Sequence, residues 1–299
     1  ERLEWGKMRM DPTDISAVTG DVLTYLVNGH GPKTNWTALF APGERVRLRF
    51  INAAAMTVFN VRIPGLSMQV VNADGQDVRP VAVDEFQFSP GETYDVIVTP
   101  SEDKAFTIVG ESVDRSGMAV ATLAPRAGMR GEVPPLRTRP VLTMKDMGME
   151  MEGMDMKSMS MRDGTNAPQV KLGPGVEMIN PMPMDRTGEP GIGLDKVDHK
   201  VLVYKDLVAL QPNPDVRAAE REIEVHLTGA MDRYMWSMDG KTMSEAHEPL
   251  PMREGERVRV TLVNDTMMAH PIHLHGHFFE LVTGHGAHSP RKHTVNVLP

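Results

Sequence analysis

A stretch of fourteen residues occurs twice in this chain of 299 residues, and this repeat limits the possible folds most strongly. The sequence GERVRLRFINAAAM, residues 43–56, aligns with GERVRVTLVNDTMM, residues 255–268, at a constant offset of 212 positions. Apolar residues occupy alternate positions in both copies, which is typical of a strand with one buried face. We therefore expect two related β units in tandem. The alternative is that strands of this type recur by chance.

Short alternating segments separated by turn signals make up most of the chain. Residues 44–52 and 221–229 both alternate apolar with charged or polar side chains, and each reads as a half-buried strand. His226 lies on the polar face of the second segment, so we expect it to be exposed. Pairs such as Asp74-Gly75 mark tight turns. Because no long segment keeps a helical period, the sequence predicts an all-β fold of sandwich or barrel units.

Composition excludes several kinds of protein. The formal net charge of −8 argues against nucleic acid or an anionic membrane as a partner. No run approaches the ~18 apolar residues that a membrane span requires. The chain contains no cysteine, which excludes disulfides, zinc ribbons and thiol nucleophiles within it.

Methionine is concentrated in residues 144–161, MKDMGMEMEGMDMKSMSM, which hold eight of the 24 methionines. Residues 145–169 include no Val, Ile, Leu, Phe, Trp or Tyr, so these methionines have no apolar partners with which to form a core. We therefore expect a flexible insert within a Met-, Pro- and Gly-rich linker over residues 136–196. The eight are Met144, Met147, Met149, Met151, Met154, Met156, Met159 and Met161.

The second copy of the repeat stops before the first one does. The first copy continues to about residue 124, whereas the second ends at residue 299, where residues 295–299 resemble residues 86–90. The counterpart of residues 91–124, which amounts to two or three strands, is absent. We therefore expect the chain to be cut inside its second unit.

Four histidines lie within eight residues of the segment AHPIHLHGHFFELV: His270, His273, His275 and His277. If this segment forms a strand, the last three share one face and His270 has the opposite parity. Pro271 lacks a donor N–H, which places it at the entry or the edge of a sheet. The spacing therefore predicts two neighbouring metal sites, with His273 and His275 in one and His270 in the other.

Alternation alone does not identify the metal. Imidazole suits zinc, copper, iron and nickel, whereas thioether sulfur selects Cu(I), so the presence of both ligand types favours copper. A pH-dependent surface patch or structural zinc is the alternative for the histidines, and an oxidisable loop is the alternative for the methionines. The remaining histidines, among them His199 and His293, are expected to be solvent-exposed and to bind no metal.

The segment HPIHLHGH resembles the third copper-binding motif of multicopper oxidases, H-P-x-H-L-H-G. WGKMRMDPTDI, NWTALFAPGERVRLRFINA, VNADGQDV, HLTGAMDRYMWSMDGK and the Met-rich insert resemble the bacterial copper-resistance protein A branch of that family. The likeness covers essentially the whole chain. It implies tandem cupredoxin-like domains: residues 1–135 as a middle domain without copper ligands, and residues 197–299 as a truncated C-terminal domain.

The resemblance also implies ligand roles. His270 corresponds to a ligand of the type 1 copper, His273 to a ligand of the type 2 copper, and His275 to a ligand of one type 3 copper. A complete member carries four coppers: one type 1, one type 2 and two type 3. The family needs two further His-x-His motifs and a terminal H-C-H-x-x-x-H segment, which this chain lacks. We therefore expect the chain alone to be inactive.

The function implied for the complete protein is oxidation of Cu(I), with phenols as a further substrate class, at the type 1 copper. Electrons then reduce O2 to water at a trinuclear copper cluster, and the Met-rich insert recruits Cu(I). A periplasmic protein that sequesters copper without turnover is the alternative. Copper ions and O2 are the expected partners, and the resemblance implies a monomer in the periplasm.

Overall fold

The computed structural model describes residues 11–16, 18–147, 160–230 and 234–299. Nearly all of its regular structure is β-strand, and the helical pieces are short 3-10 turns. Within these residues no helix is long and apolar enough to cross a membrane. The all-β prediction is therefore confirmed.

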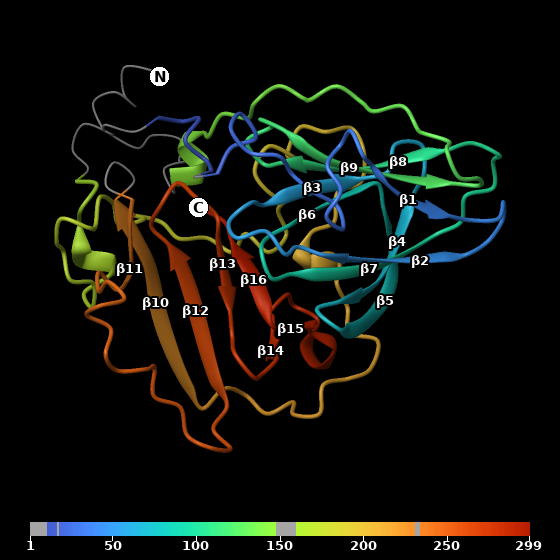
Figure 1. Ribbon diagram of the computed structural model, residues 1–299. Coiled ribbons are helices and arrows are strands. Elements are labelled where there is room, and N and C mark those ends of the chain that lie inside the picture. Colours follow the sequence, from blue (N-terminus) through green and yellow to red (C-terminus); the bar gives the residue numbers. More distant parts are fainter. Residues whose placement is uncertain (1–10, 17, 148–159, 231–233) are drawn as a thin grey trace.

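The strands fall into two groups along the chain (Figure 1). The first group is β1 (Trp36–Leu39), β2 (Val46–Ile51), β3 (Phe59–Arg62), β4 (Met68–Ala73), β5 (Gln76–Val83), β6 (Glu85–Phe88), β7 (Thr93–Val98), β8 (Phe106–Ser112) and β9 (Met118–Ala124). The second group is β10 (Arg221–Ala230), β11 (Met235–Met238), β12 (Val258–Asn264), β13 (His270–His273), β14 (Phe279–Glu280), β15 (Arg291–Lys292) and β16 (Thr294–Val297). The 3-10 turns are η1 (Met144–Met147), η2 (Gly164–Asn166), η3 (Tyr204–Asp206) and η5 (Gly286–His288).

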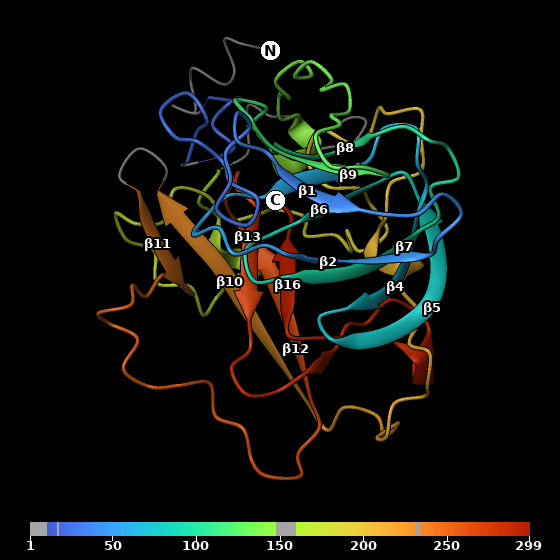
Figure 2. The same cartoon turned by 45° about the vertical axis from the view of Figure 1, so that its right-hand side comes forward.

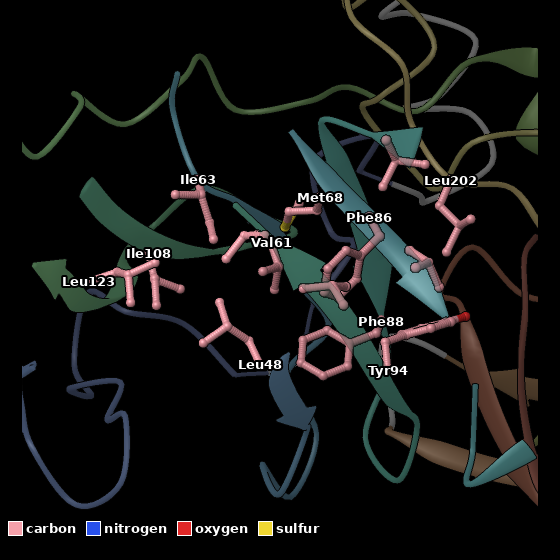
Figure 3. Packing of buried hydrophobic residues seen from close by; sticks show 14 of the residues in the cluster. Leu48, Val61, Ile63, Met68, Phe86, Phe88, Tyr94, Ile108, Leu123 and Leu202 are labelled. Atoms are coloured by element: carbon pink, nitrogen blue, oxygen red, sulfur yellow. The ribbon is translucent and has the colours of Figure 1, made fainter. Parts of the chain in front are cut away.

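The first group forms a two-sheet sandwich. One sheet has the order β1-β9-β8-β3-β6 and the other has the order β2-β7-β4-β5. Aromatic side chains pack between the sheets: the rings of Phe86 and Tyr94 lie 5.2 Å apart, and those of Phe86 and Phe88 lie 5.5 Å apart. Figure 3 shows these rings together with Leu48 of β2 in the core. The alternation predicted for residues 44–52 is confirmed, because the arginines of β2 face solvent.

The second group repeats part of this arrangement. β12 aligns with β2 in the repeated sequence, and β13 pairs antiparallel with β16 as β3 pairs with β6. β10 pairs with both β11 and β12, and β14 pairs with β15. Figures 1 and 2 show the two groups side by side, with the second group against one flank of the first sandwich. The repeat in the sequence therefore corresponds to a repeat of strand pairing.

A buried asparagine at the same position of each copy makes equivalent hydrogen bonds. Asn52 Nδ2 donates to the carbonyl oxygens of Thr57 at 2.9 Å and Phe88 at 3.1 Å. Asn264, at the offset of 212 positions, donates to the carbonyl oxygens of Met268 at 2.7 Å and Val297 at 3.1 Å. Each asparagine therefore ties the loop that follows its strand to the end of a more distant strand.

Replacement of Asn264 by alanine is expected to lower the free energy of unfolding by about 1–3 kcal/mol, because two buried carbonyl oxygens lose their donor. Chemical denaturation of the two proteins measures the difference. Asn166→Ala is the matched control, because exposed Asn166 makes one hydrogen bond to the Pro181 carbonyl oxygen. Equal losses in the two variants would contradict the bridging role of Asn264.

Parts of the predicted linker on either side of the Met-rich insert pack against other residues. Ala167, Val170, Val176 and Ile179 form a small buried cluster of their own. At the start of the linker, Arg137 pairs with two fully buried carboxylates of the first sandwich: Arg137 Nη2 lies 2.6 Å from both Glu85 Oε1 and Glu111 Oε2. Scattered apolar residues and one arginine therefore fix a segment that has no periodic pattern. Residues 148–159 lie outside the described residues.

Residues after the linker also pack on the first sandwich. Leu202 and Leu207 lie in its apolar core, and Ala209 forms a β-bridge with Val78 of β5. Figure 3 shows Leu202 among the residues of this core. The domain limits 1–135, 136–196 and 197–299 stay a prediction.

Candidate metal centre

The histidine-rich segment is a strand only in its first half. β13 ends at His273, and a turn follows in which Gly276 has a φ of 76°. The strand on which the parity argument depends is therefore present only as far as His273, and Gly276 lies in the turn with a left-handed conformation that glycine adopts readily. Pro271 lies in β13 opposite Asn296 of β16, the one strand with which β13 pairs among the described residues. This agrees with its predicted place at an edge.

The parity argument nevertheless separates the histidines as predicted. The rings of His273 and His275 lie 5.0 Å apart on the exposed side of the turn. The ring of His270 is instead half-buried and lies 5.1 Å from the ring of Trp236. His277 is exposed and has no partner among the described residues. The half-buried ring of His270 and the exposed rings of His273 and His275 therefore lie on different sides of one short strand.

The imidazole of His273 is held by one ring nitrogen. Nδ1 lies 2.8 Å from the carbonyl oxygen of His293 and 3.0 Å from Thr294 Oγ1. A carbonyl oxygen can only accept, so Nδ1 carries the proton and donates it. Nε2 is then left with its lone pair, which is the arrangement that metal-binding histidines adopt.

The ring of His270 is hydrogen-bonded through Nε2, whereas that of His273 is hydrogen-bonded through Nδ1. Nε2 lies 2.6 Å from Thr266 Oγ1, which also lies 2.9 Å from Asn264 Oδ1. Nδ1 has no hydrogen-bond partner within the described residues. Burial lowers the pKa of His270 to about 4. The ring is therefore neutral at physiological pH, the form in which imidazole binds metals.

A cavity of about 240 Å³ lies against His270. Its lining is mostly apolar and comes from both groups of strands and the chain between them, including Val58, Met56, Ile192, Trp236 and Met268. Two methionines, Met56 and Met268, therefore line the same cavity as the half-buried imidazole.

The two described ends of the Met-rich insert pack close to this cavity. Met144 and Met161 are half-buried against a cluster that includes Met267 and Met268, shortly before His270 in the chain. Met147 ends η1. The other predicted copper-recruiting methionines, Met149, Met151, Met154, Met156 and Met159, lie outside the described residues.

Five histidines outside the motif differ from the expectation of solvent-exposed side chains: His199, His226, His285, His288 and His293. His226 is only 1% exposed, because β10 is the central strand of its sheet and β11 and β12 flank it. His199 Nε2 lies 2.6 Å from Glu85 Oε2. The ring of His293 lies 5.1 Å from that of His273, so His293 belongs to the surroundings of the motif. The alternating pattern gave no sign of these contacts, since their partners are distant in the sequence.

His226 contacts two carboxylates. Its Nδ1 lies 2.7 Å from Asp265 Oδ2, and its Nε2 lies 3.2 Å from Glu224 Oε1. Burial alone would lower the pKa of His226. The hydrogen bonds and charges of Asp265 and Glu224 outweigh burial and raise the pKa above its ordinary value.

A raised pKa in the folded state means that protonated His226 stabilises the fold. This stabilisation is complete below the unfolded-state pKa of about 6.5 and is lost as the pH rises through the raised folded-state pKa. We expect His226→Asn, which keeps a donor but cannot become charged, to be most destabilising at mildly acidic pH. Denaturation of both proteins over a pH series measures this. A difference that stays constant or grows toward alkaline pH would contradict the assignment.

The donor set fits copper only as part of a site. Among the described residues no group of three or more His, Asp or Glu side chains converges on one point that could hold a metal. His273 offers Nε2 next to the ring of His275, and His270 offers Nδ1 in a separate apolar place. Neutral imidazoles are ligands that copper accepts, and the pair would need further ligands from elsewhere.

Comparisons with known proteins identify the family of the chain. Two sequence models of the multicopper oxidase family match the chain, one over residues 7–127 and the other over residues 217–299. The chain is 46% identical to a copper resistance protein A homolog of Pseudomonas syringae pv. tomato and 44% identical to copper resistance protein A of Escherichia coli. Both likenesses cover 100% of this chain and 56% and 57% of the relatives. The chain thus spans about half the length of these relatives.

Solved structures show the same fold at low sequence identity. Fet3p, a multicopper oxidase that functions in iron import, matches 89% of this chain with a TM-score of 0.53 at 15% identity, over 50% of its own chain. A laccase from B. aclada (the L499M mutant) matches 94% of this chain with a TM-score of 0.52 at 15% identity, over 49% of its own chain. The fold is therefore cupredoxin-like, as predicted, and the chain belongs to the multicopper oxidase family, in its copper-resistance protein A group.

Proposed function

We propose that this chain is part of an oxidase that oxidises Cu(I) at a type 1 copper and reduces O2 to water at a trinuclear copper cluster. The observation that carries the proposal is the division of one histidine segment between two places. His270 lies half-buried beside Trp236, whereas His273 and His275 lie together at the exposed turn. One-electron uptake and O2 reduction need separate sites, and this strand offers ligands to both.

Each histidine has a distinct role in this proposal. His270 is a ligand of the type 1 copper, through the Nδ1 that Thr266 leaves unpaired. His273 is a ligand of the type 2 copper, through the Nε2 left available when Nδ1 donates to the His293 carbonyl oxygen. His275 is a ligand of one type 3 copper. Bound copper would supply the electron transfer, and these side chains bind and orient it.

The surroundings of His270 favour Cu(I) as the substrate over phenols. Met56 and Met268 line the cavity against His270, and thioether sulfur is a soft ligand that Cu(I) prefers. Met144 and Met161 pack near the same place, so the Met-rich insert begins and ends close to the proposed electron entry point. We propose that its methionines collect Cu(I) for oxidation. We also propose that the complete protein is a periplasmic monomer, and the family resemblance supports this proposal.

The test is O2 consumption by the complete, copper-loaded protein supplied with Cu(I). We expect uptake of one O2 for every four Cu(I) oxidised, which is the electron balance of reduction to water. Copper binding without O2 consumption would contradict the oxidase and favour the alternative, sequestration of copper without turnover.

A further inference from the structure

Asp74 belongs to the first sandwich but holds the segment that orients His273. It follows β4 at the Asp74-Gly75 turn, where both residues have positive φ values, 49° and 77°. Its side chain is fully buried. The carboxylate therefore has a fixed position at the tip of the β4–β5 hairpin.

One oxygen of this carboxylate binds the first sandwich, and the other binds the second group of strands. Oδ1 accepts the backbone N–H of Thr93 at 2.9 Å, within the first sandwich. Oδ2 accepts the backbone N–H groups of His293 and Thr294, each at 3.1 Å, and lies 2.9 Å from Lys292 Nζ. One side chain of the first sandwich thus fixes three consecutive residues of the second group.

The same three residues determine how His273 is held. The proton on His273 Nδ1 has two acceptors, the His293 carbonyl oxygen and Thr294 Oγ1. Thr294 also lies directly opposite His273 in the β13–β16 register. If residues 293–294 shift, both acceptors shift with them.

We propose that Asp74 is a positioning residue for the copper ligand His273. Through the backbone of residues 293–294 it keeps the proton of His273 on Nδ1 and presents Nε2 to the metal. The proposal rests on the proposed role of His273 as a ligand only in its last step, because the tautomer of His273 is a property of the copper-free chain.

The first readout is therefore taken without copper. Nitrogen-15 NMR of the histidine rings distinguishes a proton on Nδ1 from one on Nε2, and His273→Gln assigns the signal. We expect the Nδ1–H form in the wild-type chain. In Asp74→Asn a mixture should appear, because an amide has one acceptor oxygen and cannot serve both Thr93 and residues 293–294. Asparagine also tolerates the left-handed turn conformation.

Asp74→Gly should shift the equilibrium further, since glycine accepts the positive φ and removes the side chain altogether. Val70→Ala is the matched control: Val70 is fully buried in β4 opposite Val81 and Val96, so its truncation destabilises the same sheet and leaves the Asp74 carboxylate in place. We expect this variant to keep the wild-type tautomer. If Asp74→Gly does not fold, Asp74→Asn alone decides the outcome.

The second readout is copper affinity in the complete protein, measured by titration and by the EPR spectrum of type 2 copper. We expect Asp74→Asn to weaken binding at this site by about 10–100-fold, the usual effect of an altered partner of a metal-binding histidine. An unchanged tautomer in both Asp74 variants, or an equal change in Val70→Ala, would overturn the proposal. A shifted tautomer with unchanged copper binding would support the role of Asp74 in positioning the His273 ring. It would refute the role of His273 as a copper ligand.

Discussion

Replacement of Lys292 by methionine is expected to lower the free energy of unfolding by about 3–5 kcal/mol, because it leaves two buried carboxylates without their cation. Lys292 is fully buried, and its Nζ lies 2.9 Å from Asp74 Oδ2 and 3.2 Å from Glu92 Oε1. Nζ also lies 4.9 Å from the centre of the Tyr94 ring. Chemical denaturation measures the loss, and the two groups of strands should separate more easily because the contact joins them.

Lys104→Met is the matched control for this prediction. Lys104 Nζ lies 2.8 Å from Glu102 and 5.1 Å from the centre of the Phe106 ring, but the side chain is 50% exposed. An exposed ion pair contributes about 0–1 kcal/mol. Similar losses in the two lysine variants would mean that the buried cluster does not join the units.

Replacement of His273 or His275 by alanine is expected to lower O2 consumption by the complete, copper-loaded protein by more than about 100-fold. Removal of a side chain that only hydrogen-bonds to a metal ligand lowers metal affinity or activity by about 10–100-fold. Removal of the ligand itself should therefore lower activity further. Initial rates of O2 uptake with Cu(I) in excess measure the effect.

His277→Ala is the control in the same turn. His277 is exposed and has no partner among the described residues, so its removal should leave the rate within about 2-fold of wild type, as for surface positions generally. Equal losses at positions 273 and 277 would show that the turn as a whole matters, and would refute His273 as a ligand.

The sequence predicted the parts of the fold that depend on local pattern. The repeated segment located β2 and β12, and the Asx-Gly pairs at residues 28–29, 74–75 and 239–240 all form turns with two positive φ values. The pattern could not show that β10 is a central strand, so His226 was expected to be exposed. Burial of Lys292 was likewise invisible, since Arg291-Lys292 reads as the polar start of a strand.

The candidate site was predicted in part for the same reason. Strand parity separated His270 from His273 because residues three apart on a strand lie on opposite faces. The contacts that orient His273 could not be predicted, since Asp74 is 219 and 220 positions from the two backbone N–H groups that it binds. The repeat aligned Asn52 with Asn264, but only the structure shows that each donates equivalent hydrogen bonds within its own copy. Contacts over such separations leave no periodic signal.

The central claim is that one histidine segment serves two copper centres, and spectroscopy of the complete protein tests it most directly. Absorption of the copper–thiolate bond reports the type 1 copper, and the EPR spectrum of type 2 copper reports the other centre. We predict that His270→Ala abolishes the thiolate absorption and keeps the type 2 signal, whereas His273→Ala does the reverse. Loss of both signals in each variant, or the opposite assignment, would contradict the division of the segment.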